Sequence, residues 1–341
     1  LILFLALNCP LVQRQIRNMQ FTADIIDTLG SRYREIILPI PKDITFRKEL
    51  SEKMKQALDT RIRYKAAIKQ MPLLIESVLE SGTTQAFDTF FSKPIDEVLN
   101  ELVQDTTTLE FGFFSAFRLN SSAITNGIYL PKYYDPAVEN ILRKLDGTCT
   151  RYSIQSLLND KVIELATGDE IGKMAYGTGS IPFVRTSDFS NWEIKADAKQ
   201  GVSEEIYEQY ALKEDVRPGD ILIVRDGTYL VGTSCLITEY DQKMLYCGGL
   251  IKIRVLKKDI LDEYLLLGLL NSYIVKRQIR TKQFTRDVID TLGQRLREVT
   301  LPLPHSVELR HAISVQIRHI IENRIEARDC VSNLSRQLIE L

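Results

Sequence analysis

Cysteine, histidine and long apolar runs are all scarce in this chain of 341 residues. The five cysteines are scattered and odd in number, which argues against a disulfide framework and against a zinc knuckle. The apolar run from Leu1 to Ala6 is far too short to span a bilayer, and no basic region with a cleavage site marks a signal peptide. We therefore expect a globular, cytoplasmic protein with no membrane partner.

An excess of one charge is also missing, because 44 Lys and Arg stand against 45 Asp and Glu, for a formal net charge of −1. This balance gives no global sign of nucleic-acid binding. If DNA is the partner, the basic surface must be local or partly supplied by another subunit. The length and the apolar content of 44% are enough for two or three domains with ordinary cores.

Motifs of catalysis are absent as well. No glycine-rich cofactor loop precedes an acidic partner, and the Asn/Asp-Pro-Pro-aromatic motif of amino-methyltransferases does not occur. Asp188 and the Glu-Ile-Lys triplet at 193–195 faintly resemble the carboxylates and lysine of a metal-dependent nuclease, but such triplets are common by chance. His305, His311 and His319 lie at or within a long helix, the last two on its charged face. We expect no catalysis, metal or cofactor in this chain.

What the chain does contain is a long internal repeat. The segment "QFTADIIDTLGSRYREIILPIP" begins at Gln20, and "QFTRDVIDTLGQRLREVTLPLP" begins at Gln283, an offset of 263 residues. The match runs back without a gap to Leu7 and Leu270, and forward as an apolar pattern to the last residue. The repeat is roughly 78 residues long.

Each copy predicts four elements in a fixed order. The first is an amphipathic helix, clearest from Ile260 to Thr281, and the second is a turn in which Gly293 permits the left-handed backbone that closes many helices. The third is a short strand at 299–304, which its prolines restrict to a sheet edge. The fourth is a long helix, about 36 residues and roughly 55 Å in length, and Pro72 should bend the first copy near its end.

The long helices carry the most specific pattern, because their apolar residues are spaced by three and four as in a coiled-coil seam. Two ordinary surface helices would also show apolar stripes, but here both copies keep one register. We expect the helices to pack antiparallel, because a parallel pair would set Arg61 against Arg324 and an antiparallel pair would separate them. The seam residues assigned to this contact are Met54, Arg61, Tyr64, Ile68, Ile317, Ile320, Arg324, Val331 and Leu334.

Between the copies, short β signals punctuated by Gly and Pro predict a compact α+β body of about 130 residues. A helix from Ala137 to Lys144 comes first, and one helix is all that we expect there. Asp226-Gly227 predicts a hairpin turn, and Asp188 predicts a cap or turn. The β signals are at 152–154, 181–185, 220–224, 231–237 and 250–256.

Four segments of this region resemble a known family. They are "NGIYLPKYYDP" at Asn126, "IPFVRTSDFSNWEI" at Ile181, "VSEEIYEQYALKEDVRPGDILIVRDGTYLVGTSCLI" at Val202 and "IKIRV" at Ile251. They resemble the target-recognition domain of type I restriction–modification DNA specificity (S) subunits, and the flanking repeats resemble the spacer regions of that family. The resemblance covers essentially the whole chain.

The resemblance implies an α+β fold, in which a small mixed α/β target-recognition domain is flanked by two long spacer helices that form an antiparallel coiled coil. The implied domains begin with residues 1–42, the tail of a first recognition domain, and residues 43–81, the first spacer helix. Residues 82–130 are a linker or entry segment. Residues 131–304 are the recognition domain with its closing helix and edge strand, and residues 305–341 are the second spacer helix.

The implied function is non-catalytic recognition of one half of a bipartite double-stranded DNA target. Methyltransferase (M) subunits and the restriction (R) subunit would be the protein partners, and S-adenosylmethionine, ATP and Mg²⁺ would bind only to them. This chain departs from the family pattern by showing one recognition domain. We expect roughly 185 further residues upstream, or else a half-subunit that dimerises.

By position in the family, the residues that contact DNA should lie in two segments, 173–188 and 225–233. A glycine-containing loop could approach phosphates, and an arginine could donate two hydrogen bonds to guanine. Structural roles in turns and strands are the alternative for each of them. The candidate residues are Lys173, Tyr176, Gly177, Gly179, Arg185, Thr186, Ser187, Arg225, Thr228 and Tyr229.

A coiled-coil scaffold whose central domain binds protein is the rival hypothesis. The segment 136–262 holds 20 Asp and Glu against 16 Lys and Arg, an acidic balance that favours this rival. The basic helix ends at Arg14, Arg17, Arg277 and Arg280 could contact phosphate or a partner, although a solvated helix terminus is the commoner explanation.

Overall fold

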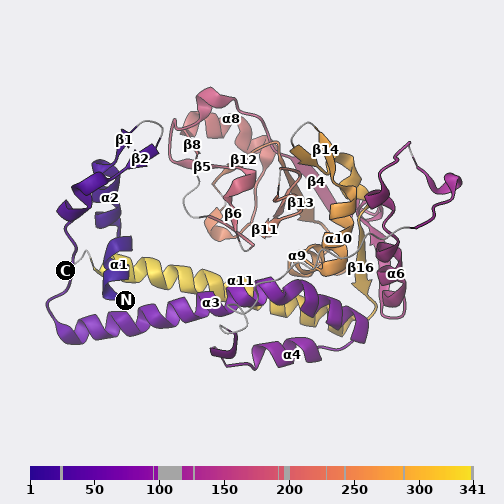
Figure 1. The fold of residues 1–341 in the computed structure, drawn as a ribbon, viewed down its shortest axis with the longest axis horizontal. Coiled ribbons are helices and arrows are strands. Elements are labelled where there is room, and N and C mark those ends of the chain that lie inside the picture. The colour runs from indigo at the N-terminus through magenta and orange to yellow at the C-terminus, as the bar shows by residue number, and fades with distance from the viewer. Residues whose placement is uncertain are drawn as a thin grey trace. The chain divides into compact units, whose positions relative to one another are not determined.

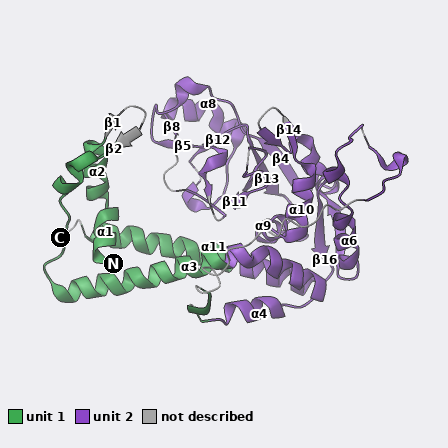
Figure 2. Cartoon of the chain, in the orientation of Figure 1, with its two compact units in different colours: residues 1–66, 94–105, 319–341 green, residues 67–93, 106–318 purple. Residues whose placement is uncertain are grey.

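The computed structural model describes residues 1–23, 26–94, 96–98, 117–125, 127–190, 192–195, 200–227, 229–241, 243–286 and 289–338. The chain divides into two compact units (Figure 2). Unit 1 comprises Leu1–Ala66, Pro94–Asp105 and His319–Leu341, and unit 2 comprises Ala67–Lys93 and Thr106–Arg318. None of the helices in the described ranges is long and apolar enough to cross a membrane.

The first copy of the repeat begins with two short helices and ends in a long one (Figure 1). Its elements are α1 (Ile2–Asn8), α2 (Pro10–Met19), β1 (Phe21–Ala23), β2 (Ile26–Thr28), the 3-10 helix η1 (Gly30–Glu35) and α3 (Ile44–Ser81). The second copy has the same order with one strand more, β16, which has no counterpart in the first: α9 (Glu263–Leu270), α10 (Tyr273–Lys282), β14 (Phe284–Arg286), β15 (Ile289–Thr291), η7 (Gly293–Glu298), β16 (Thr300–Pro304) and α11 (Val307–Gln337). The repeat in the sequence is therefore a repeat in structure.

The two copies also share individual hydrogen bonds. In the second copy, the side-chain amide of Gln278 donates to the carbonyl of Thr300 (2.7 Å) and accepts from its N–H (2.8 Å). In the first copy, Gln15 makes the same pair of bonds with Ile37, both at 2.9 Å. In each copy this glutamine joins the second helix to the segment that precedes the long helix.

The single helix expected from Ile260 to Thr281 is wrong, because the chain forms α9 and α10 with a break at Asn271 and Ser272. The Asn271 amide donates to the Leu267 carbonyl (2.8 Å), and the Ser272 hydroxyl accepts from the N–H of Val275 (3.4 Å). Asn and Ser side chains that bond to nearby backbone favour helix ends over helix interiors.

The glycine turn and the proline-containing strand follow the sequence more closely. Gly293 and its equivalent Gly30 have the expected positive φ, at 50° and 52°, but they open a 3-10 helix instead of closing an α-helix. Strand β16 pairs only with β3 (Cys149–Ser153) in a two-stranded antiparallel sheet. The prediction of an edge strand is therefore confirmed for the second copy, and it is wrong for the first, where residues 36–41 form no strand.

The two copies differ in the surroundings of their first helix. Leu266, Leu267 and Leu270 of α9 are fully buried, and α9 packs on β11 (Ser234–Leu236). The equivalent Leu3, Phe4 and Leu7 of α1 are 56%, 47% and 37% exposed. The copies are therefore alike in backbone and unlike in environment.

The body between the copies is a mixed α/β arrangement in unit 2, as the sequence predicts. Its main sheet has the antiparallel order β11-β9-β13-β4, and a second sheet has the order β12-β5-β8, in which β12 and β5 are parallel. The remaining elements before β9 are α4 (Gln85–Phe91), η2 (Ser121–Ala123), η3 (Pro131–Tyr134), α6 (Pro136–Leu145), α7 (Ile154–Asn159), β4 (Ile163–Thr167), η4 (Lys173–Ala175), β5 (Ile181–Val184), η5 (Thr186–Asp188), β6 (Phe189–Ser190), β7 (Glu193–Ile194), β8 (Gly201–Val202) and α8 (Glu204–Glu214). They continue with β9 (Ile221–Val224), β10 (Asp226–Gly227), η6 (Glu239–Asp241), β12 (Leu245–Tyr246) and β13 (Leu250–Val255).

The expectation of one helix in this body is wrong, because α7 and α8 follow α6. Ser153 caps α7 by accepting from the N–H of Ser156 (2.9 Å), and Ser203 caps α8 by accepting from the N–H of Ile206 (3.4 Å). Both caps precede helix-forming residues, which is a signal that the β-rich pattern obscured.

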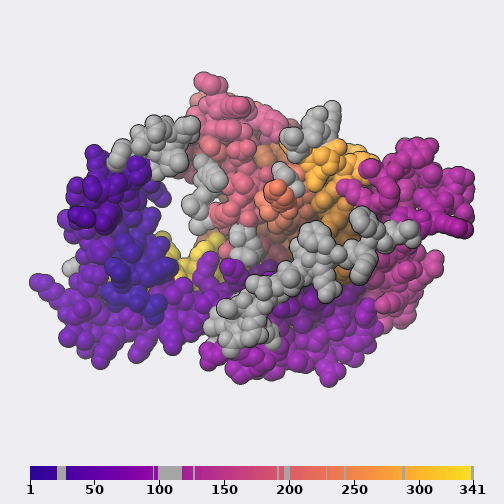
Figure 3. Space-filling model, viewed as in Figure 1, coloured from indigo at the N-terminus to yellow at the C-terminus, as the bar shows by residue number. Residues whose placement is uncertain are grey.

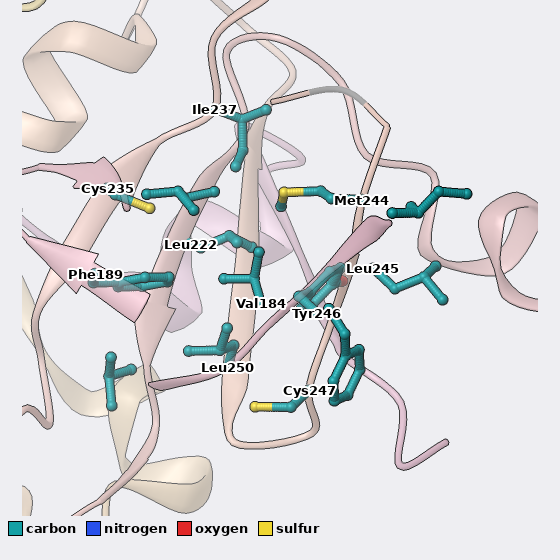
Figure 4. Packing of buried hydrophobic residues seen from close by; sticks show 14 of the residues in the cluster. Val184, Phe189, Leu222, Cys235, Ile237, Met244, Leu245, Tyr246, Cys247 and Leu250 are labelled. Atoms are coloured by element: carbon teal, nitrogen blue, oxygen red, sulfur yellow. The ribbon is translucent and has the colours of Figure 1, made fainter. Parts of the chain in front are cut away.

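The core of the body lies between the two sheets (Figure 4). Phe183, Leu222, Leu245 and Tyr246 are fully buried there. Burying an apolar side chain of this size contributes about 1.5–3 kcal/mol, so this cluster fixes the ends of β5, β9 and β12 in space.

Charged groups are buried beside this core. Glu214, Asp220 and Lys252 are 2%, 1% and 3% exposed, and the Arg254 guanidinium donates to Asp220 at 2.7 Å. Burial raises the pKa of Glu214 to about 8, although the N–H of Tyr246 donates to its carboxylate at 2.9 Å. The end of α8 is thereby held against the sheet by polar contacts inside the protein.

The long helices pack antiparallel within unit 1. Leu50 and Met54, near the start of α3, share a core cluster with Leu334 and Leu338, near the end of α11. Further along, the Tyr64 hydroxyl lies 2.9 Å from Nε2 of His319. The predicted orientation is therefore confirmed.

The reason given for this orientation is wrong. Arg61 lies three residues before Tyr64, and Arg324 lies five residues after His319. In an antiparallel pair these positions lie within about 3 Å of one another along the helix axes. Arg61 and Arg324 are equivalent residues of the two copies. A pseudo-twofold axis that crosses both helices brings equivalent residues near it to the same height along the helix axes, so the antiparallel arrangement does not separate the two arginines.

Candidate nucleic-acid interface

The two segments proposed to contact DNA lie where strands of the core end. Thr186 follows β5, Arg225 follows β9, and Gly249 lies in the turn between β12 and β13. The N–H groups of Arg225 and Asp226 donate to the Gly249 carbonyl at 2.8 and 3.2 Å. A Cβ on Gly249 would lie 3.0 Å from Cγ2 of Thr186. The structure thus brings both segments together around one glycine.

The first segment presents a cation beside an aromatic ring. The ring of Tyr176 stacks on Phe183, with 5.5 Å between centroids, and the guanidinium of Arg185 lies 5.8 Å from the Tyr176 centroid. Arg185 is exposed, as is Lys173 at the start of η4. Tyr176 is half-buried, so the core fixes the ring on which the arginine rests.

The glycines of the first segment have a structural reason for their identity. The N–H of Gly177 donates to the carbonyl of Gly201 at 2.8 Å. A Cβ on Gly179 would lie 2.3 Å from the carbonyl oxygen of Val202, which is closer than any side chain can come. These contacts attach the loop after η4 to β8.

Thr186 and Ser187 are half-buried in η5, and Asp188 closes that turn. The carboxylate of Asp188, which is 1% exposed, accepts from the N–H of Arg185 at 2.9 Å. The prediction that Asp188 is a cap is therefore confirmed. The ammonium group of Lys195, the lysine of the nuclease-like triplet, donates to the carbonyl of Ser187 at 2.5 Å.

The second segment is tied to the repeat. Asp226-Gly227, expected as a hairpin turn, instead forms β10, which pairs with β15 as the third strand of the repeat hairpin. The Thr291 hydroxyl donates to Asp226 at 2.5 Å, and Arg225 lies 2.6 Å from the same carboxylate. The turn prediction was wrong because Asp226 and Gly227 pair with the edge of β15. That strand is distant in the sequence and lies beside them only in the folded chain.

The exposed tip of the second segment is Tyr229, whose side chain is 94% exposed. Thr228, its neighbour and another candidate, lies outside the described residues. Met174, at the tip of the first segment, is 93% exposed. Each of the two segments therefore presents one large side chain to solvent.

A second cluster that sequence reasoning missed surrounds the repeat hairpin. The ammonium group of Lys282 lies 3.6 Å from the ring centroid of Tyr133, and the guanidinium of Arg295 lies 3.8 Å from that of Phe284. Tyr133 also contacts Phe284 edge to face and donates to Glu298. The repeated Phe and the "KYYDP" segment were the available signals.

The chemistry of this face suits binding. Cations, hydroxyls and exposed aromatic groups can contact phosphates and bases. In the part of the chain that the structure describes, no group of three or more His, Cys, Asp and Glu is placed to hold a metal ion. The Asp188 carboxylate, one member of the nuclease-like pattern, is already occupied as a cap.

The nine residues assigned to the coiled-coil contact differ in how deeply they are buried. Arg61 and Val331 are half-buried, and the other seven are buried. Those seven are Met54, Tyr64, Ile68, Ile317, Ile320, Arg324 and Leu334.

Solved structures resemble the chain over 99% of its length. They include the S subunit of a type I restriction-modification system from M. genitalium, with 12% identity, a TM-score of 0.42 and 70% of that chain covered. The HsdS subunit from Thermoanaerobacter tengcongensis matches with 15% identity, a TM-score of 0.37 and 68% of that chain covered. A structure on complex assembly and conformational transition of the type I R-M system has the same three values.

No family model matches the chain, and no curated protein matches it.

Proposed function

We propose that this chain is a DNA-recognition subunit of a type I restriction–modification complex, which recognises one half of a bipartite target. It contributes no catalytic group of its own. Methyltransferase subunits, and in the complete complex a restriction subunit, bind to it and carry S-adenosylmethionine, ATP and Mg²⁺.

The observation that carries this proposal is the duplicated unit. Two copies of one helix-hairpin-helix module, alike down to the Gln15 and Gln278 hydrogen bonds, flank a single mixed α/β body, and their long helices run antiparallel. Duplicated modules on antiparallel rods are suited to a target with two halves. Major grooves on one face of DNA recur about every 34 Å, and rods of 38 and 31 residues, roughly 57 and 46 Å long, can keep two recognition sites at least one turn apart.

The second support is the face around Gly249. Thr186, next to the exposed Arg185, lies against Gly249, and Lys173 and Tyr229 of the two segments are also exposed, although the chain as a whole is electrically balanced. A local group of cations is what a nearly neutral DNA-binding protein requires, since phosphate contacts dominate affinity. Arg185 is the residue best placed to donate to a base edge.

A protein-binding scaffold is the second candidate function, and the acidic balance of segment 136–262 favours it. The two functions differ in what the assembled complex binds. A scaffold would join its partners without any preference among DNA duplexes.

A reconstitution experiment tests the proposal. The purified chain, mixed with methyltransferase subunits and S-adenosylmethionine, should support methylation of one duplex sequence among many, whereas the chain alone with S-adenosylmethionine or Mg²⁺ should neither methylate nor cleave. Catalysis by the chain alone would contradict the non-catalytic role. A complex that forms and shifts no duplex would favour the scaffold.

A further inference from the structure

A cavity of about 690 Å³ opens between α10 and the segment around η3 in unit 2. Its apolar part consists of Pro72, Phe117, Pro131 and Tyr273. The segment before α6 that supplies two of these residues lies at the surface of unit 2 (Figure 3). Cavities of about 300–1,000 Å³ with apolar walls and a few polar groups are typical of small-molecule sites. None of these residues belongs to the candidate DNA-contacting segments.

The polar part of the cavity is cationic. Lys132, Lys276, Arg277 and Arg280 line it, against one carboxylate, Asp135. That carboxylate is already engaged, because Arg277 pairs with it at 2.7 Å. In the described part of the chain, Lys132, Lys276 and Arg280 have no carboxylate partner. Three positive charges therefore surround the cavity without compensation.

Lys276 is the most informative of these groups. It is half-buried on α10, one turn before Arg280. Burial and the nearby guanidinium of Arg280 lower the pKa of Lys276. A cation that is partly desolvated and repelled by its neighbour costs free energy, which a bound anion would offset.

The shape of the site distinguishes between sources of such an anion. A duplex is a convex cylinder, so its backbone reaches the exposed Lys132 and Arg280 more readily than the half-buried Lys276. A small molecule can place phosphates among the three cations and an aromatic ring against Tyr273 and Phe117. Inorganic phosphate alone would leave the apolar part unused.

We propose that this cavity binds a phosphate-bearing small molecule of the nucleotide class, with its phosphates at Lys132, Lys276 and Arg280 and its ring against Tyr273. The proposal does not depend on the function proposed above, because the site shares no residue with the candidate DNA-contacting segments. The internal repeat provides a natural control: the first copy has Gln13 in place of Lys276 and Arg17 in place of Arg280.

Calorimetric titration of the full chain with ADP and with pyrophosphate tests the proposal. Both ligands should bind, ADP more tightly because its ring contacts the apolar part. Lys276→Met and Arg280→Gln should each weaken ADP binding at least tenfold, a typical order for one lost charge-assisted contact. Arg17→Gln, at the equivalent position of the first copy, should leave binding unchanged.

Absence of binding of both ligands at millimolar concentration would overturn the proposal, as would equal affinities of all four proteins for ADP. A titration with a nonspecific duplex is run in parallel. If Lys276→Met and Arg280→Gln weaken only duplex binding, these cations contact the DNA backbone and the small-molecule site is wrong. Circular dichroism of each variant confirms folding, and the milder Lys276→Gln replaces Lys276→Met if the latter unfolds.

Discussion

At the scale of single residues, Gln15 and Gln278 make the same pair of hydrogen bonds in two different environments. Gln278 is 3% exposed and joins α10 to the backbone of Thr300 through two hydrogen bonds. Gln15 makes the same bonds to Ile37, whose side chain is 74% exposed. The geometry of the hydrogen bonds is the same in both copies, but water has easier access to the bonds of Gln15 than to those of Gln278.

Replacing Gln278 with Met should lower the free energy of unfolding by about 2 kcal/mol, because it leaves buried backbone groups without partners. Gln15→Met should cost less than about 0.5 kcal/mol, because water replaces the lost bonds. Urea denaturation measures both. The only tryptophan, Trp192, is 4% exposed in unit 2 and reports on Gln278→Met, and circular dichroism reports on Gln15→Met. Equal losses in both variants would contradict the argument.

Glu214 predicts a specific dependence of stability on pH. Its pKa is raised from 4.5 to about 8 by burial, so the folded protein retains a proton that the unfolded chain releases. Its contribution to stability is complete below about pH 4.5 and is lost as the pH rises through 8.

Glu214→Gln removes this titration, so the variant should gain stability relative to the original chain as the pH is raised from about 5 to about 9. Thermal denaturation across this range measures the difference. Glu208→Gln, an exposed position on the same helix, is the control and should follow the original chain at every pH. If the Glu214→Gln curve also stays parallel to it, Glu214 is ionised throughout.

Arg185 carries the prediction for DNA. Its exposed guanidinium lies over Tyr176, so Arg185→Ala should weaken specific duplex binding by the reconstituted complex by about 1–3 kcal/mol. Arg217→Ala, which removes an exposed arginine paired with Asp215, should have no effect. Fluorescence anisotropy on matched and mismatched duplexes makes the comparison. A base contact is excluded if the loss is the same for every duplex.

At the scale of elements, the sequence predicted some strands of the body and missed others. The five β signals correspond to β3, β5, β9, β11 and β13, whereas β4, β6, β7, β8 and β12 were not predicted. The break at Asn271 was missed because apolar residues continue at helical spacing on both sides of it. β10 could not be predicted, since a two-residue strand exists only through its partner β15, 65 residues away at Thr291 and Asp226.

The long helices show the strength and the limit of pattern reasoning. The heptad spacing identified buried residues correctly, and the repeat identified their partner. The prediction that Arg61 and Arg324 lie apart along the helix axes was wrong, because a twofold axis brings equivalent residues of two helices together where it crosses them. Register between helices depends on where the axis crosses them, which no single helix encodes.

Cysteine crosslinking tests the arrangement of the rods in solution. In a Cys330→Ser background, Leu50→Cys with Leu334→Cys should form a disulfide, because these residues share a core cluster in the antiparallel pair. Leu50→Cys with Ile313→Cys, the pair that a parallel in-register arrangement would bring together, should not. Non-reducing electrophoresis distinguishes the two, and crosslinking of only the second pair would reverse the orientation.

At the scale of the whole molecule, the sequence predicted the two segments of the candidate DNA-binding site, but it did not predict that they lie together. Thr186 and Arg225 are far apart in sequence, and their meeting at Gly249 follows from the pairing of β5 with β12 and of β9 with β13, because Gly249 lies between β12 and β13. The Gly248-Gly249 doublet was a signal that could have been used. The cationic cavity beside α10 was beyond reach, because it joins Pro72, Phe117 and Lys276 from three distant parts of the chain.

We propose that the body between the repeats determines which DNA sequence is recognised. Exchanging residues 136–262 for the corresponding body of another such subunit, in cells that supply methyltransferase subunits, tests it through mapping of methylated sites across the genome. We predict that one half of the methylated sequence changes, while the other half and the spacing between them stay the same. An unchanged methylated sequence, from a complex shown to assemble, would contradict the claim.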